Sequence, residues 1–262
     1  MSALAAAFGS ARADGRALLV GYLPAGFASP DVFRAMVDGG AGVVEVGLPY
    51  SDPLMDGPTI QQAVQRALDA GTHTRDVLAT VEAVAATGVP VVVMTYWNPV
   101  ERYGVDAFAR DLAAAGGAGA ITPDLIPEEA GAWLAAAHAH ALDPVFLVAP
   151  SSTDERLGVV ARTGSGFVYA ASTMGVTGTR DAVADTAPAL VARMRAVTDL
   201  PVAVGLGVST GAQAAEVAGY ADGVIVGSAF VRAALDADSE RAARDAVGAL
   251  ATVLAEGCRA RA

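Results

Sequence analysis

The sequence has little cysteine, few positive charges and no long apolar run. Its 262 residues include one cysteine, Cys258, so no disulfide can form within the chain. The 28 acidic residues outnumber the 17 basic ones, and the formal net charge of −11 disfavours nucleic acid and anionic lipid as partners. No segment approaches the ~18 consecutive apolar residues that span a bilayer, and residues 1–16 resemble an amphipathic helix rather than a signal peptide. We therefore expect a soluble, cytoplasmic protein that binds neither nucleic acid nor membrane.

The chain also lacks any internal boundary. No Pro/Ser-rich linker, charge block or low-complexity tract divides it. Hydrophobic residues make up 53% of the composition, which is typical of a globular chain with a large core. One β/α barrel needs ~250 residues, so we expect residues 1–262 to form a single domain.

Short apolar runs rich in Val and Ile recur along the chain and are separated by Ala-rich stretches with helical spacing. Continuous apolar runs of this length are typical of strands buried on both faces of a parallel sheet. The clearest helical stretches are residues 106–116 and 128–140. The predicted strands are 17–23, 42–48, 90–96, 119–125, 144–150, 166–172, 201–207 and 223–229.

Eight strands that alternate with helices predict a (β/α)8 TIM barrel, here with an additional helix at the N-terminus. The alternative is an open, doubly wound parallel sheet. The count of eight favours a closed barrel, as do the polar or Gly residues at nearly every carboxyl end of a strand. In such a barrel the functional residues lie at those ends.

Two acids follow the second predicted strand. Glu45 lies among valines and shares a strand face with Val43 and Gly47, so it faces the barrel interior. Loss of water there raises the pKa of a carboxyl toward the range useful for proton transfer. A structural, hydrogen-bonded Glu is an equally good interpretation of this position alone. Asp56 follows on a loop, where "MDGP" is also an ordinary turn sequence, but the pair suits a division of acid and base roles.

Three Gly-bearing turns late in the chain predict a phosphate site. "GVTGT", "GLGVS" and "VGSAF" follow the sixth, seventh and eighth predicted strands, and barrels often bind phosphate at the last two of these positions. We expect Gly207, Gly227 and Ser228 to contribute, with Ser228 capping a short helix. Taken singly, each glycine is better explained by a tight turn, and it is the three turns together that favour phosphate. No lysine lies at a strand end, so a Schiff base is excluded, and the three histidines form no metal cluster.

Six segments occur in the order and spacing of the tryptophan synthase α subunit, a family that this sequence resembles over nearly its whole length. They are "EVGLPYSDPLMDGPTIQ", "MTYWNP", "ITPDLIPEE", "FVYAASTMGVTGTR", "VGLGVS" and "ADGVIVGSA". The resemblance implies a β/α barrel that cleaves indole-3-glycerol phosphate to indole and glyceraldehyde 3-phosphate. It also implies no cofactor in this chain, with pyridoxal phosphate only in a partner β subunit, and an α2β2 complex.

The resemblance assigns a role to each matching position. Glu45 matches the general acid/base, Asp56 the acid beside the indole N–H, and Tyr169 the tyrosine next to the catalytic Glu. Thr177 matches the loop residue that holds the catalytic Asp on closure. The positions that match phosphate contacts are Gly178, Gly207, Gly227 and Ser228, and those that match the substrate pocket or its rim are Tyr96 and Asp124.

Two other functions compete with this lyase. An allosteric partner without catalysis is expected to keep the phosphate site and lose the acid pair, yet both acids are present. A different phosphosugar enzyme with a barrel fold, such as an isomerase, needs its acids at other strand ends, and the "EVGLPYSDPLMDGP" segment argues against it.

Overall fold

The computed structural model describes residues 1–171, 186–205 and 207–259. Its centre is one sheet in which every strand pairs in parallel with its neighbours, in the order β5-β4-β3-β2-β1-β9-β8-β7-β6. The strands are β1 (Leu18–Pro24), β2 (Val43–Gly47), β3 (Val91–Met94), β4 (Gly119–Ile121), β5 (Asp143–Val145), β6 (Leu147–Val148), β7 (Val168–Ala171), β8 (Val202–Gly205) and β9 (Gly223–Val226).

The sheet curls into a nearly closed barrel because its two outermost strands are neighbours in the chain. Only Phe146 separates β5 from β6, and its carbonyl accepts a hydrogen bond from the Tyr169 N–H at 3.1 Å. The single strand predicted over 144–150 is therefore two short pieces, of which β5 pairs with β4 and β6 with β7. The eight predicted strands are all present, and this division makes nine strands among the described residues.

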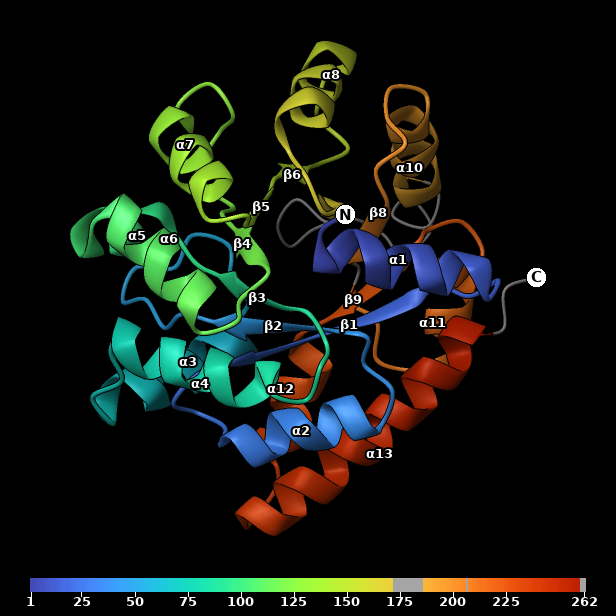
Figure 1. The fold of residues 1–262 in the computed structure, drawn as a ribbon. Helices are drawn as coiled ribbons and strands as arrows, with labels where there is room; N and C mark the ends of the chain where they lie inside the picture. The colour runs from blue at the N-terminus through green and yellow to red at the C-terminus, as the bar shows by residue number, and fades with distance from the viewer. Residues whose placement is uncertain (172–185, 206, 260–262) are drawn as a thin grey trace.

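Helices surround the strands (Figure 1), and α13 packs against α2, α11 and α12. The described helices are α1 (Ala3–Ala13), α2 (Pro30–Asp38), α3 (Pro58–Asp69), α4 (Thr74–Ala85), α5 (Trp97–Tyr103), α6 (Val105–Ala114), α7 (Gly131–Ala139), α8 (Asp154–Thr163), α10 (Thr186–Arg195), α11 (Gly211–Ala218), α12 (Ser228–Leu235) and α13 (Glu240–Arg259). None of them is both long enough and apolar enough to cross a bilayer. The helix predicted over 128–140 begins only at Gly131, because the Glu129 and Ala130 N–H groups close a turn on Ile126 and Pro127.

The additional N-terminal helix α1 closes the amino end of the barrel, and it lies in front of the strands in Figure 1. Leu4, Phe8 and Ala11 are buried against inward-facing strand residues such as Val20. The Phe8 and Phe167 ring centroids are 5.3 Å apart. Because side chains fill this end among the described residues, the barrel interior opens toward the carboxyl ends of the strands.

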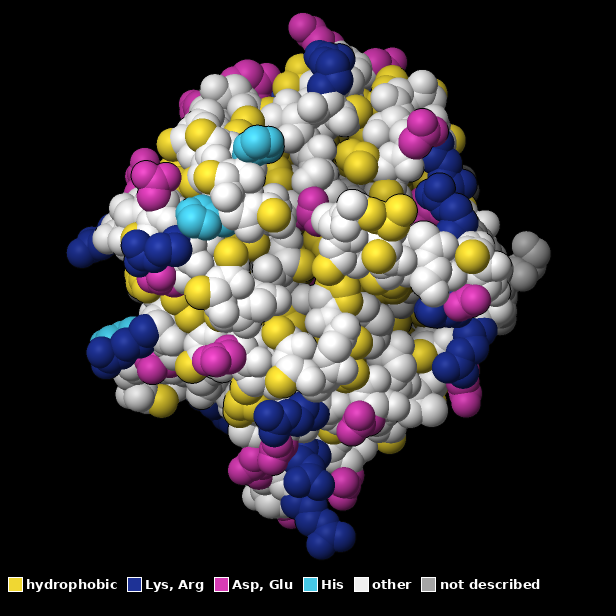
Figure 2. Space-filling model, viewed as in Figure 1, with side chains coloured by type: hydrophobic (Ala, Val, Ile, Leu, Met, Phe, Trp, Pro, Cys, Tyr) yellow, Lys and Arg dark blue, Asp and Glu magenta, His cyan; other side chains and the backbone are white. Residues whose placement is uncertain are grey.

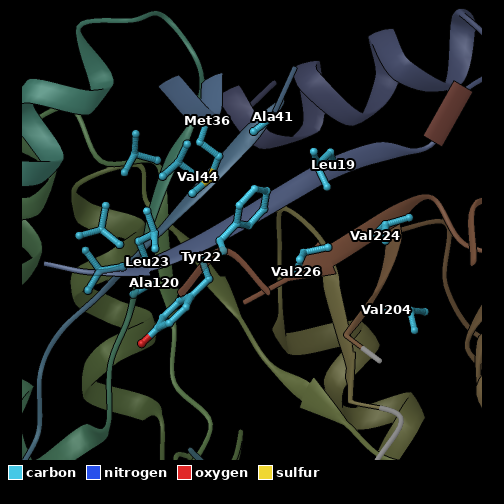
Figure 3. Close-up of a cluster of buried hydrophobic side chains, with 14 of the residues drawn as sticks. Leu19, Tyr22, Leu23, Met36, Ala41, Val44, Ala120, Val204, Val224 and Val226 are labelled. Carbon is cyan, nitrogen blue, oxygen red and sulfur yellow. The ribbon is translucent and has the colours of Figure 1, made fainter. Parts of the chain in front are cut away.

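A second apolar layer lies between the strands and the helices, and Figure 3 shows part of it around Leu19, Met36 and Val44. Gly21 on β1 makes one close approach in this layer possible. A Cβ atom at that position would lie 2.1 Å from the Met36 sulfur, so only glycine allows α2 to pack this closely. The two layers together fix the strand register on which the site depends.

Charged side chains of both signs are interspersed over the face that α1 covers, as Figure 2 shows. Several arginines pair with nearby acids on the described surface, for example Arg34 with Asp31 at 2.6 Å. Such a mixed surface, together with a net charge of −11, gives no extended positive field for a phosphate backbone.

Candidate active site

A cavity of about 220 Å³ opens at the carboxyl ends of the strands, opposite α1. It takes residues from most of the barrel strands and from the loops that follow them, as expected for a β/α barrel. Its lining residues are Tyr22, Glu45, Met55, Asp56, Gly57, Ile60, Met94, Leu147, Tyr169, Ala171, Gly205, Gly207, Ile225, Gly227 and Ser228.

Glu45 projects into this cavity from β2. It lies opposite Tyr22 of β1 and Val92 of β3 in the sheet register, and only 2% of its surface is exposed. Its Oε1 atom has no hydrogen-bond partner among the described residues. Burial raises the pKa of Glu45 from 4.5 to about 8. The side chain is therefore protonated near neutral pH and is suited to give and take protons.

Tyr22, which is buried, and Tyr169, which is partly buried, share the cavity with Glu45, and each lies over a glycine on the neighbouring strand. A Cβ atom on Gly47 would lie 2.5 Å from the Tyr22 hydroxyl, and one on Gly205 would lie 2.7 Å from the Tyr169 hydroxyl. Burial, together with the nearby Asp56 and Glu45 carboxylates, raises the pKa of both phenols above its ordinary value. Both phenols therefore stay neutral and can act as hydrogen-bond donors.

Asp56 reaches the same cavity from the loop between β2 and α3, so the two acids meet at one space. Partial burial raises the pKa of Asp56, and a hydrogen bond with the Tyr96 hydroxyl acts in the opposite direction. The Tyr96 hydroxyl also accepts a hydrogen bond from the Met55 N–H at 2.9 Å. Glu45 and Asp56 thus differ in environment: one is enclosed in the barrel and the other lies on a loop at its mouth.

The glycine turns that follow β8 and β9 also line the cavity. Gly207, with φ at +64°, follows β8, while Gly227 and Ser228 lie at the start of α12. The prediction that Ser228 caps this helix is wrong, because Gly227 occupies the cap position and makes no side-chain cap. The helix starts one residue earlier than predicted, so the Ser228 backbone N–H is one of the unpaired donors of the first turn. Those N–H groups and the helix dipole favour an anion.

Two of the predicted site residues do not line the cavity, and two others are not described by the structure. Tyr96 is absent from the cavity lining and contacts the Asp56 loop instead. Asp124 caps α5, where its two carboxylate oxygens accept the Trp97 N–H at 2.9 and 3.1 Å. Thr177 and Gly178 lie outside the described residues.

Sequence reasoning missed Tyr22 and the apolar wall of the cavity. Alternation along β1 could have identified Tyr22. Leu18 and Val20 face inward, and Tyr22 is the next residue on the same face of the strand. The residues of the apolar wall are far apart in the sequence, so no local pattern predicts that they come together. Its members are Met55, Ile60, Met94, Leu147 and Ile225.

Metal chemistry has no support in the described ranges. No group of three or more His, Cys, Asp or Glu side chains is arranged to hold a metal ion there. The cavity instead combines an enclosed acid, a loop acid, an apolar wall and an anion-favouring helix start. Such a set suits a substrate with an aromatic body and a phosphate.

Comparison with known proteins agrees with this chemistry. The family model for the tryptophan synthase alpha chain matches residues 8–258. The tryptophan synthase alpha chains of Thermobifida fusca and Nocardia farcinica are each 61% identical, the first over 100% of both chains and the second over 98% of this chain and 96% of its own. A crystal structure of tryptophan synthase from M. tuberculosis, in an open form with BRD0059 bound, is 55% identical with a TM-score of 0.90 and covers 98% of this chain and 99% of its own. The α subunit from Legionella pneumophila str. Paris is 32% identical with the same TM-score, over 98% of both chains. This chain belongs to the tryptophan synthase alpha chain family.

Proposed function

We propose that the cavity between Glu45 and Asp56 is where this chain cleaves indole-3-glycerol phosphate. The chain is a carbon–carbon lyase of tryptophan biosynthesis and releases indole and glyceraldehyde 3-phosphate, as its membership of the family indicates. The observation that carries the assignment of the site is the buried Glu45 carboxyl, whose Oε1 atom faces no partner among the described residues. A group buried at such cost is explained by a substrate that completes its hydrogen bonding.

Glu45 supplies the proton transfers of this cleavage. The bond that breaks joins C3 of the indole ring to the glycerol chain, and the ring accepts a proton at C3 before it can leave. Protonated Glu45 gives that proton, and the resulting carboxylate then takes the proton of the adjacent glycerol hydroxyl. The hydroxyl oxygen becomes the aldehyde as the C–C bond electrons return to the ring. Glu45 ends the cycle protonated, as it began.

Asp56 stabilises the intermediate. Protonation at C3 places positive charge on the indole nitrogen, and an ionised carboxylate beside that nitrogen lowers the energy of the cation. Tyr169 supports the same step by lying beside Glu45 as a neutral donor. The apolar wall binds the flat ring and keeps water from it.

The phosphate binds where Gly207, Gly227 and Ser228 line the cavity. Backbone N–H groups at the start of α12 donate to its oxygens, and the helix dipole favours its charge. Because the phosphate is bound away from the reacting bond, it orients the substrate so that C3 lies next to Glu45. We place Gly178 and Thr177 in the same site on the strength of the family resemblance alone.

The chain pairs with a tryptophan synthase β subunit, and pyridoxal phosphate belongs to that subunit. We propose that this chain carries no cofactor of its own, since the proton transfers above use only side chains and backbone groups. We further propose an α2β2 complex, one domain over residues 1–262, and a cytoplasmic location that suits the single cysteine.

The deciding experiment supplies purified chain with indole-3-glycerol phosphate and measures released indole, with and without a β subunit. Release of indole by the isolated chain supports catalysis in this cavity. No release by the chain, with indole formed equally well by a β subunit in its absence, contradicts the proposal. The Asp56→Asn variant tests the second acid, and we expect it to lose most of its kcat while its affinity for inorganic phosphate is unchanged. Asp69→Asn, which removes an exposed carboxylate at the far end of α3, is the matched control.

A further inference from the structure

The end of the loop that carries Asp56 has few contacts of its own. Leu54 is 79% exposed and Met55 is 53% exposed. Backbone groups at this end form hydrogen bonds with the rest of the protein. The Met55 N–H donates to the Tyr96 hydroxyl at 2.9 Å, and the Gln61 side chain donates to the Asp56 carbonyl at 2.7 Å. The position of the Asp56 carboxylate therefore depends on a small number of contacts.

Tyr96, in contrast, is held firmly at the end of β3. It is 6% exposed, and the Thr95 hydroxyl donates to its carbonyl at 2.9 Å. On one side the Thr95 N–H donates to the Ile121 carbonyl of β4 at 3.0 Å. On the other side the Trp97 N–H is bound by the Asp124 carboxylate. Its backbone is thus fixed to the barrel on both sides.

The Tyr96 side chain makes further contacts with the loop besides the Met55 bond. The centroid of its ring lies 5.4 Å from that of the Tyr50 ring, and its hydroxyl hydrogen-bonds the Asp56 carboxylate. One phenol oxygen thus accepts from the loop backbone and donates to the loop acid. Because Tyr96 does not line the cavity, these contacts reach a substrate indirectly, through Asp56 and Met55.

We propose that Tyr96 is a positioning residue for the cleavage: its hydroxyl fastens the loop to the end of β3 and holds the Asp56 carboxylate in place beside the indole nitrogen. This inference rests on the proposed role of Asp56 and adds the group that orients it. Asp124 supports Tyr96 in turn, because its carboxylate binds the Trp97 N–H and so fixes the start of α5 immediately after Tyr96.

The hydrogen bond also favours the ionised form of Asp56. Burial alone raises the pKa of this carboxyl, and the Tyr96 hydroxyl opposes that rise. The other titratable groups of the cavity are Glu45, Tyr22 and Tyr169. The first is protonated near neutral pH, and the two phenols are neutral. Arg232, a cation on α12, donates to Thr59 at 2.8 Å, and no cation is among the groups that shift the pKa of Asp56. Tyr96 is thus the one described group whose hydrogen bond lowers the pKa of Asp56.

The Tyr96→Phe variant tests the proposal, because it keeps the ring and removes only the hydroxyl. We expect kcat to fall about tenfold with little change in KM. We also expect the acidic limb of the pH–kcat profile to move to higher pH, since Asp56 without its donor ionises less readily. Tyr103→Phe is the matched control. It too loses a phenol that donates to a carboxylate, that of Asp111 at 2.8 Å, but this pair lies outside the cavity. Its kcat and pH profile should stay unchanged.

A double variant separates positioning from general structural damage. If Tyr96 acts through Asp56, Tyr96→Phe causes no further loss of single-turnover rate when Asp56 is already Asn. An acidic limb that does not move in Tyr96→Phe, or a tenfold loss that persists in the Asp56→Asn background, overturns the inference. If Asp56→Asn alone keeps full activity, the proposed role of Asp56 fails instead, which is a separate result.

Discussion

Glu45 and Tyr22 lie directly opposite each other in the pairing of β2 with β1, at the layer of the barrel where the filled core gives way to the cavity. Both side chains are buried, and the Glu45 Oε1 atom has no hydrogen-bond partner among the described residues. The layer below them is apolar and closed by α1. A polar atom without a partner at the floor of an enclosed cavity is best explained by a ligand that binds there.

The Glu45→Gln variant should lose cleavage while keeping its fold. General acid/base catalysis contributes about 10²–10⁴-fold, and Gln can neither give nor take the proton. We expect kcat for indole release to fall by about 10³-fold, with far-UV circular dichroism unchanged. Glu82→Gln on the exposed side of α4 is the control and should behave as the wild type. Normal turnover in Glu45→Gln means that another group carries the proton.

Glu45 should also make stability depend on pH in a predictable direction. Its pKa is about 8 in the folded chain against an ordinary 4.5, so the folded state holds a proton that the unfolded state releases between these values. This contribution to stability is fully present below pH 4.5 and is lost as the pH rises through about 8. The free energy of unfolding of the wild type, relative to Glu45→Gln, should therefore fall by up to about 5 kcal/mol over that window.

Urea unfolding of the two proteins at several pH values from 5 to 9 measures this difference. Glu45→Gln has no group to titrate at this position, so all other ionisable groups cancel in the comparison. A difference that stays constant, or that grows with pH, contradicts burial of a protonated Glu45.

The Ser228→Asp variant should weaken phosphate binding without damaging the helix that holds the site. A carboxylate in the first turn of α12 interacts favourably with the positive end of the helix dipole, so the melting temperature should be equal or slightly higher. The same charge repels the substrate phosphate, and we expect KM to rise at least about tenfold. Competitive inhibition by inorganic phosphate gives an independent measure. Unaltered KM and phosphate inhibition argue that the phosphate binds elsewhere.

The Gly205→Ala variant should disturb Tyr169. A Cβ atom there would lie 2.7 Å from the Tyr169 hydroxyl and 3.1 Å from the ring, so the ring must move into the cavity. Overpacking of this kind costs about 1–3 kcal/mol, and we expect both a lower melting temperature and a lower kcat/KM. Gly131→Ala at the start of α7 is the matched control, because a Cβ atom there meets nothing within 4 Å. Full activity in Gly205→Ala means that the position of Tyr169 matters little.

The existence and order of the strands followed from the sequence, because runs such as "GVVEVGL" are apolar, short and β-branched. Their ends did not. The run at 119–125 is a strand only to Ile121, since the residues beyond leave the sheet for loops, and there Asp124 caps α5. The position of Glu45 on an inward face followed from alternation along the strand, as its burial beside Val43 confirms.

Sequence patterns did not predict the contacts between segments that are distant in the chain. Nothing near Tyr96 in the chain predicts its bonds to Met55 and Asp56, which lie some forty residues earlier. The apolar wall likewise draws one residue each from several strands. Such sets arise only when the closed sheet sets the register of all its strands.

The amino-acid sequence by itself determined the alternation of strands and helices, the enclosed acid and the glycine-bearing turns, because periodicity, β-branching and turn chemistry are local properties. The tertiary structure decided that Glu45 has no partner among the described residues and a pKa near 8, and that Tyr96 holds the Asp56 loop. Desolvation and hydrogen-bond geometry depend on which segments the closed barrel brings together, and a linear pattern does not contain that information.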